Sequence, residues 1–104
     1  MEFIETPIFT REIRRLLSDD EYRRMQIALL LRPDMGDLIQ GSGGLRKLRW
    51  RIAGQGKRGG LRVIYYWVVP DCIYMLLPYQ KTTQEDLTPS QLRTLRKLVK
   101  EWLQ

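Results

Sequence analysis

Three consecutive β-type stretches, joined by short connections, constrain the fold of this chain more than any other feature. They are LRKLRWRI at 45–52, LRVIYYWVV at 61–69 and CIYMLLPY at 72–79. The first alternates apolar and basic residues, and the other two are rich in β-branched and aromatic residues. Pro70 and Asp71 supply the turn between the last two. Strands that follow one another through short links form an antiparallel meander, so we expect an antiparallel sheet.

Three helices are expected to pack on this sheet. Thr6-Pro7 and Thr88-Pro89-Ser90-Gln91 each place a capping threonine before a proline, and Ser18-Asp19-Asp20-Glu21 has the spacing of a capping box. The second helix is expected to end near Arg32, because Pro33 disfavours helical backbone in the residue before it. The expected inner faces are the apolar residues at helical spacing: Ile8, Phe9, Ile13, Leu16 and Leu17; Tyr22, Met25, Leu29 and Leu30; Leu92, Leu95, Leu98, Val99 and Trp102.

The resulting element order is β-α-α-β-β-β-α, with EFIE at 2–5 as a short edge strand. This order predicts an α+β fold, in which an N-terminal helical hairpin and a C-terminal helix pack on a small antiparallel sheet. The 104 residues suit a single domain, 1–104, and the 43% of hydrophobic residues is enough to form a core.

Composition argues against several classes of function. The chain has no histidine, which is the commonest general base and metal ligand, and its one cysteine, Cys72, cannot form an internal disulfide. We expect no metal site and no cofactor. No apolar run approaches the ~20 residues of a membrane span. These features predict a cytoplasmic protein that does not bind a membrane.

Positive charge is concentrated in the middle of the chain. No acidic residue lies between Asp37 and Asp71, whereas outside this window eleven Lys and Arg face twelve Asp and Glu. The window contains seven cations: Arg46, Lys47, Arg49, Arg51, Lys57, Arg58 and Arg62. A patch of this kind predicts a polyanionic partner, most simply nucleic acid. The alternative is a solvated basic face that favours solubility.

All eight glycines also lie in this region, between Gly36 and Gly60. The segment GQGKRGG at 54–60 is expected to form the hairpin loop between the first two long strands, with Lys57 and Arg58 projecting from it. The backbone N–H groups of such a loop can face an anion, so the loop is either a solvated hairpin or a phosphate clamp. The GxxxxGK[ST] spacing of nucleotide-triphosphate loops is absent.

Arg62 stands one residue inside an apolar strand, where a charge needs a partner or lines a cleft. One interpretation is an ion pair with an acid at the start of the second helix, at 19–21. The other is a cleft of cations at one end of the sheet. The side chains expected to converge in such a cleft are Arg62, Lys81, Lys47 and Arg49, over a floor of Tyr66 or Tyr79.

Such a cleft contains groups that suit the cleavage of RNA by its own 2′-OH. The reaction needs a base for the hydroxyl, neutralisation of the phosphorane charge and an acid for the leaving oxygen. Arginine supplies the second. A lysine whose cationic neighbours disfavour its charged form can act as the base, and another lysine or a tyrosine as the acid. Carboxylates offer little alternative, since the nearest pair along the sequence is Glu85 and Asp86.

Four segments resemble the HigB-like branch of the RelE family of toxins, which belong to bacterial type II toxin–antitoxin systems. They are GDLIQGSGGLRKLRW at 36–50, GKRGGLRVIYYW at 56–67, LPYQK at 77–81 and EDLTPSQ at 85–91. The resemblance extends from Ile4 to about Leu103. It implies the RelE-like fold, with the same β-α-α-β-β-β-α order.

The resemblance implies a ribosome-dependent endoribonuclease, or mRNA interferase, that cleaves message in the decoding site and so inhibits translation. It also implies a cognate antitoxin, typically a small helix-turn-helix DNA-binding protein. Two alternatives remain. One is a non-catalytic nucleic-acid-binding or regulatory module of the same fold, and the other is an interaction partner that holds an acidic protein through the patch.

Active sites of this family are clusters of lysine and arginine, often with a late tyrosine. By resemblance, the catalytic residues are Arg62, Lys81, Lys47 and Arg49, with Arg62 at the phosphorane and Lys81 or Lys47 transferring the proton. RNA or ribosome binding is predicted for Arg46, Arg51, Lys57, Arg58, Tyr66 and Tyr79. Leu87 stands where the late tyrosine is expected, so either Tyr66 or Tyr79 takes its place or no tyrosine is needed.

Overall fold

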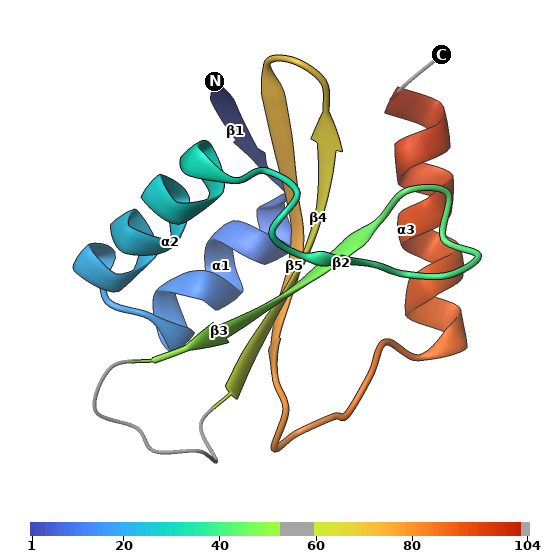
Figure 1. Ribbon diagram of the computed structural model, residues 1–104. Helices are drawn as coiled ribbons and strands as arrows, with labels where there is room; N and C mark the ends of the chain where they lie inside the picture. The colour runs from blue at the N-terminus through green and yellow to red at the C-terminus, as the bar shows by residue number, and fades with distance from the viewer. Residues whose placement is uncertain (53–59, 103–104) are drawn as a thin grey trace.

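The computed structural model describes residues 1–52 and 60–102, except for the side chain of Trp102, and has an α+β fold (Figure 1). Its elements in chain order are β1 (Glu2–Glu5), α1 (Pro7–Leu16), α2 (Asp19–Leu31), β2 (Asp37–Leu38), β3 (Arg46–Arg51), β4 (Gly60–Val68), β5 (Cys72–Gln80) and α3 (Pro89–Trp102). Within these residues, no helix is both long enough and apolar enough to cross a membrane.

The five strands form one mixed sheet in the order β1-β5-β4-β3-β2. Strands β2 to β5 pair antiparallel, as the meander pattern predicts, and β1 is an edge strand as expected. However, β1 runs parallel to β5, so the prediction of a purely antiparallel sheet is wrong. A parallel pair needs a long crossover connection, and the chain between β1 and β5 supplies one. The two-residue β2 is a further strand that the sequence pattern did not predict.

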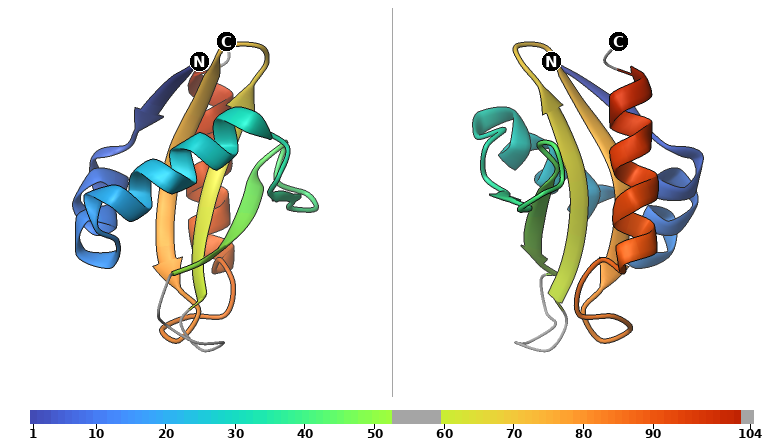
Figure 2. Two further views of the ribbon diagram at one scale, coloured as in Figure 1. Left: turned by 60° about the vertical axis from the view of Figure 1, so that its left-hand side comes forward. Right: turned by 90° about the vertical axis from the view of Figure 1, so that its right-hand side faces the viewer.

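Helices cover both faces of this sheet (Figure 2). The first core lies between the sheet and the pair α1 and α2. It contains Phe9, Ile13, Leu17, Met25, Leu29, Leu48, Leu61, Val63, Tyr65, Ile73 and Met75. The second core lies under α3. It contains Leu45, Ile64, Leu76, Tyr79, Leu95 and Val99. Most of the predicted inner positions are buried or half-buried, but Ile8 and Leu30 are exposed, because each lies at the margin of its helix's apolar stripe.

Local sequence sets where the helices begin. The Thr6 Oγ1 accepts a hydrogen bond from the backbone N–H of Phe9 at 3.0 Å, and Ser18 caps α2 in the same way. The capping box of α3 is complete, because Gln91 N–H donates to Thr88 Oγ1 and Thr88 N–H donates to Gln91 Oε1, both at 3.0 Å. The helix starts predicted from these signals are therefore confirmed.

A β-bulge in β5 changes which face of the sheet its later residues occupy. The register of β4 and β5 shifts so that Leu76 has no partner across the ladder. Met75, before the bulge, packs in the first core, whereas Tyr79, four residues later, packs in the second. In a regular strand two residues four apart share a face. The bulge therefore brings Tyr79 onto the α3 face of the sheet, where it lies opposite Arg62.

Candidate functional site

Two arginines and a tyrosine form a row across three strands on the α3 face of the sheet. Arg49 of β3 lies opposite Arg62 of β4, and Arg62 lies opposite Tyr79 of β5. Directly opposite residues of antiparallel strands share a face, with Cβ atoms about 4.5–5.5 Å apart. We call these three residues the cross-strand row. Like charges directly opposite each other destabilise a sheet, so the stability of the sheet does not account for the two arginines.

Further cations lie on either side of this row. Lys47 lies opposite Ile64, and Arg51 lies opposite Gly60. The backbone N–H of Lys81 donates to the Gly60 carbonyl oxygen at 3.0 Å, which places Lys81 at the level of Arg51. The structure thus brings the four predicted catalytic residues to the end of the sheet that lies away from the termini (Figure 1). We call Lys47, Arg49, Arg51, Arg62 and Lys81 the cation cluster.

Gly60 leaves space for the guanidinium group of Arg62. A Cβ atom built on Gly60 would lie 2.8 Å from Nη1 of Arg62, well inside van der Waals contact. The Arg62 side chain therefore extends over Gly60, toward the level of Arg51 and Lys81. Among the described residues, its one hydrogen bond is a long 3.5 Å contact from Nη1 to the carbonyl oxygen of Leu61. The guanidinium keeps nearly all of its donors for a ligand.

The alternative interpretation, in which Arg62 pairs with an acid at 19–21, is wrong. The start of α2 belongs to the other face of the sheet, where Glu21 accepts a hydrogen bond from Trp50 Nε1 at 3.4 Å. Within residues 1–52 and 60–102, neither Arg62 nor Arg49 forms an ion pair. The two arginines of the cross-strand row therefore have no carboxylate in direct contact among the described residues.

Asp86 reaches the cluster from the connection between β5 and α3. Its Oδ1 accepts a hydrogen bond from Lys47 Nζ at 2.8 Å, with the Lys47 side chain 20% exposed and that of Asp86 72% exposed. This bond and the Lys47 charge lower the pKa of Asp86 most, and Arg49 and Arg62 lower it further. Among the described residues, Asp86 is the only carboxylate paired with the cluster. Sequence reasoning gave it no role.

Tyr79 closes the row with a buried hydroxyl. The residue is 6% exposed, and its OH has no hydrogen-bond partner in the part of the chain that the structure describes. Burial raises the pKa of Tyr79 most, the Asp86 charge raises it too, and Arg62 and Arg49 oppose both. The phenol is therefore protonated at neutral pH and is a donor. Unpaired buried polar groups are rare and often mark functional sites.

A pocket of about 460 Å³ lies beside Tyr79, between α1 and the connection that follows β5. Its polar lining includes Gln80, Gln84 and Gln91. β1 pairs only with residues 72–75 of β5, which leaves the later part of that edge free of a neighbouring strand. This concave surface at the edge of the sheet is therefore next to Tyr79 of the cross-strand row, and no member of the cation cluster is among its described lining residues.

Arg46 lies apart from the cluster, although it was predicted to bind RNA. It shares a face with Leu48, and its Nη1 donates to the carbonyl oxygens of Gly36 at 2.7 Å and Asp34 at 3.2 Å. Tyr65 lies opposite Arg46 and donates to the carbonyl oxygen of Pro33 at 2.7 Å. These bonds hold the segment that follows α2, so Arg46 has a structural role on the other side of the sheet.

Tyr66 is also distant from the cross-strand row. A Cβ atom on Gly44 would lie 2.9 Å from Tyr66 Cε2, so Tyr66 packs on the glycine turn that precedes β3. Four residues separate it from Arg62, which is about 13 Å along the strand. Leu87, at the position of the family's late tyrosine, packs against the second core. Of the candidate tyrosines, only Tyr79 joins the cluster. Lys57, Arg58 and their loop lie outside the described residues.

Across the described part of the chain, no three His, Cys, Asp or Glu residues are grouped so that they could hold a metal ion. The side-chain groups that the described site offers are guanidinium, ammonium, carboxylate and phenol. No protein-family model matches the chain.

Proposed function

We propose that this protein is a RelE/HigB-like toxin of a type II toxin–antitoxin system, acting as a ribosome-dependent mRNA endonuclease. The proposal rests on the cross-strand row, in which two arginines without carboxylate partners lie beside a buried hydroxyl without a hydrogen-bond partner. Five cations with one paired carboxylate attract a polyanion. Donors fixed on strands suit the stabilisation of a phosphorane.

In the proposed reaction, the 2′-oxygen of one nucleotide attacks the adjacent phosphorus, and the bond to the 5′-oxygen of the next nucleotide breaks. The products are a 2′,3′-cyclic phosphate and a 5′-hydroxyl, and no water is consumed. Arg62 neutralises the charge on the phosphorane. Lys81 takes the proton of the 2′-OH or gives one to the 5′-oxygen, whereas Lys47, which Asp86 holds as an ammonium, can serve only as the acid. Tyr79, as a protonated phenol, donates to a phosphate oxygen or serves as the acid.

The remaining cations hold the RNA in this proposal. Arg49 and Arg51 face the same side of β3 and bind the backbone of the message or ribosomal RNA. Asp86 holds the Lys47 ammonium in place through the 2.8 Å hydrogen bond. The proposal includes a cytoplasmic location, the ribosome as a partner, and a helix-turn-helix antitoxin that neutralises the toxin.

The test is to map the 5′ ends of message on purified ribosomes with and without the protein. We expect wild type to cut at a fixed offset in the decoding-site codon, and Arg62→Ala to lose about 100-fold or more in rate. Arg14→Ala, which removes an exposed cation from α1 on the other face, is the matched control and should cut as wild type does. Absence of cuts by the wild type would leave the non-catalytic binding module as the function. Cuts retained by a folded Arg62→Ala would refute this active site.

Gly60→Ala tests the geometry of the site without removing a charge. Gly60 does not have a positive φ, so alanine fits its backbone, but the new Cβ forces the Arg62 guanidinium to move. We expect the cleavage rate to fall by about 10- to 100-fold, because small displacements of a catalytic group are costly. The urea midpoint and the affinity for RNA should stay near those of wild type. A fully active Gly60→Ala would show that the position of Arg62 does not matter.

A further inference from the structure

A second group of cations lies on α3. Arg93, Arg96, Lys97 and Lys100 are spaced i, i+3, i+4 and i+7, which places them on one face of the helix, and the helix's apolar residues pack into the second core. We call these four residues the α3 basic face. None of them forms an ion pair with another described residue. Like charges at this spacing destabilise a helix, so helix stability does not account for them.

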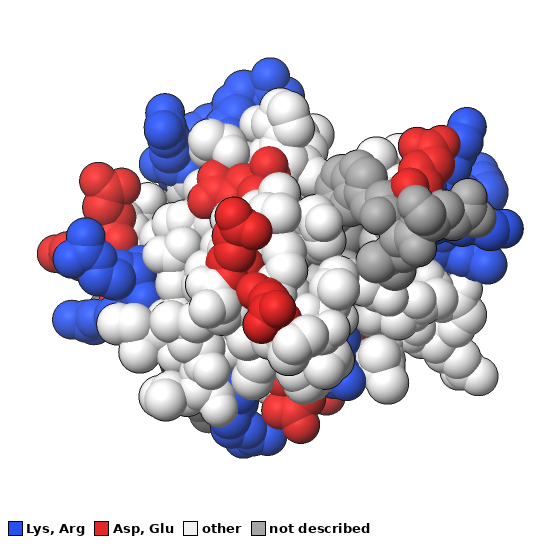
Figure 3. All heavy atoms as spheres, turned by 90° about the horizontal axis from the view of Figure 1, so that it is seen from above, with Lys and Arg blue, Asp and Glu red and all other residues white. Residues whose placement is uncertain are grey.

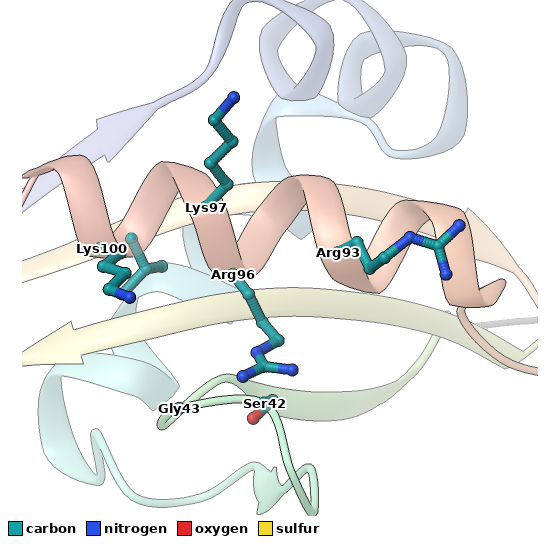
Figure 4. Close-up of a pocket in the computed structure, with 7 residues that line it drawn as sticks. Ser42, Gly43, Arg93, Arg96, Lys97 and Lys100 are labelled. Carbon is teal, nitrogen blue, oxygen red and sulfur yellow. The ribbon is translucent and has the colours of Figure 1, made fainter.

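A groove of about 640 Å³ separates the α3 basic face from the turn at 41–44. Figure 4 shows Arg96 extending from α3 toward Ser42 and Gly43, with Lys97 pointing the other way. Gly43 has a φ of +79°, and a Cβ atom there would meet nothing within 4 Å, so the backbone of the turn is open to a ligand. Ser42 Oγ is already used, since it accepts from Leu45 N–H at 3.0 Å and so fixes the turn.

The groove and the cation cluster lie on the same face of the sheet. Leu45, just before β3, packs with Leu95 and Val99 of α3. Further along, Lys47 is bonded to Asp86, just before α3 begins. The start of β3 therefore lies near α3, from which β3 runs in roughly the opposite direction, and both elements carry cations. The 14 residues of α3 extend over about 21 Å. An extended polyanion in this position contacts the cluster at one end and the α3 basic face at the other.

We propose that the α3 basic face is a second phosphate-binding site for the same RNA strand that enters the cation cluster. The inference rests on the proposed function for the identity of the polyanion. RNA fits better than an acidic peptide, because the cations are spread along the groove and Val99 is the only large apolar residue among the described residues that line it. A peptide needs buried apolar anchors, whereas phosphates are bound by arginine forks and open backbone N–H groups.

The test measures binding of an uncleavable 2′-O-methyl RNA of about 12 nucleotides, a length typical of such grooves. Fluorescence anisotropy over a range of salt gives the affinity and its salt dependence, without ribosomes. We expect Arg93→Ala/Arg96→Ala to weaken binding about 10-fold or more and to reduce the log–log salt slope by about 1.4, which is 0.7 per lost phosphate contact. The control Arg14→Ala/Arg23→Ala removes the same charge from α1 and α2 and should bind as wild type does.

Equal affinity of the α3 double variant and the control would overturn the proposal, as would wild-type protein that does not bind this RNA. If polyglutamate competes as well as RNA and loses affinity in the same variant, the face binds an acidic protein and the proposal is wrong. A failure of the proposed nuclease function would give a different result. Wild-type protein would then bind the RNA through α3 but would not cut message on ribosomes. With cleavable message, the α3 double variant should raise KM and leave kcat unchanged.

Discussion

The stability of the fold does not explain why Tyr79 has a buried hydroxyl. Burying a hydroxyl without a partner costs about 1–3 kcal/mol, and the Tyr79 hydroxyl has no partner among the described residues. Arg62, its neighbour across the ladder, and the nearby Arg49 and Asp86 are all charged. Phenylalanine would fill the same space without this cost. In the proposed reaction, a phosphate oxygen accepts the hydrogen bond of this hydroxyl.

Tyr79→Phe is expected to separate stability from activity. Removing the unpartnered hydroxyl should leave the free energy of unfolding unchanged or raise it by up to about 1 kcal/mol. Cleavage should slow by about 100-fold, the lower end of what a general acid contributes. Urea unfolding and single-turnover cleavage measure the two effects.

Tyr65→Phe is the matched control, because Tyr65 is buried in the other core. Its hydroxyl donates to Pro33 O at 2.7 Å and accepts from Gly36 N–H at 2.8 Å. This variant should lose about 1–3 kcal/mol of stability and keep its cleavage rate in folded protein. The opposite pattern, with Tyr79→Phe unstable and active, would make Tyr79 a core residue and nothing more.

Part of the site follows from the sequence and part does not. The alternation in 45–52 correctly separates Lys47 and Arg49 from Leu48, because strand periodicity is a local property. The place of Tyr79 depends on a bulge that the residue pattern does not reveal. The bond between Lys47 and Asp86 joins residues 39 apart, and only the path of the connection before α3 brings them together.

At the scale of elements, the connection from β5 to α3 is fixed by the first turn of α3. Gln91 Oε1 accepts from Thr88 N–H at 3.0 Å and from Gln84 Nε2 at 2.9 Å. Gln84 Nε2 also donates to the carbonyl oxygen of Asp86 at 2.9 Å. The helix start thus holds the segment that carries Asp86 over the cation cluster.

Gln91→Ala is therefore expected to reduce both stability and activity. It removes the reciprocal half of the capping box, worth about 1 kcal/mol, and frees Gln84 from α3. Urea unfolding should show this loss, and the cleavage rate should fall as Asp86 and Lys47 lose their fixed geometry. Ser90→Ala, on the same turn with an exposed side chain, should change neither. A Gln91→Ala protein with a normal cleavage rate would show that this connection does not position the site.

Helices that begin at capping residues could be predicted from the sequence, whereas the strands that pair with one another could not. The threonine and serine caps fix the helix starts at 7, 19 and 89. The EFIE sequence does not specify that β1 pairs with β5 in parallel, because the residue pattern of a strand indicates which face is buried but not which strand lies beside it.

The α3 basic face was not predicted from the sequence, because cations and acids outside the central window nearly cancel in number. Its spacing at 93, 96, 97 and 100 was the available signal.

Over the whole molecule, charge is separated in space. The end that carries the termini shows acidic side chains at its centre and Lys and Arg gathered at its margins (Figure 3). The cation cluster lies at the opposite end of the sheet, where one paired carboxylate accompanies five cations. We therefore expect positive potential along the face shared by β3, β4 and α3, which would steer a polyanion to that side.

The same architecture makes the site rigid, which hydrogen exchange can test. β4 has a strand on both sides, β5 has one on both sides at residues 72–75, and helices cover both faces of the sheet, so the buried amides of these segments should exchange only by global unfolding. The two exposed residues of β2 at the sheet edge should exchange much faster. Arg62 lies on β4 between Arg49 and Tyr79, so a protected β4 holds the centre of the cross-strand row in place before RNA arrives, as electrostatic stabilisation requires.

Binding of uncleavable RNA should slow hydrogen exchange of the amides in the 81–88 connection and leave the exchange rates in β4 and β5 unchanged. Exchange in α2 serves as the internal control. If the amides of β4 exchanged as fast as those of β2, the cross-strand row would form only when RNA binds. The free-energy cost of ordering two arginines side by side would then weaken the binding of RNA.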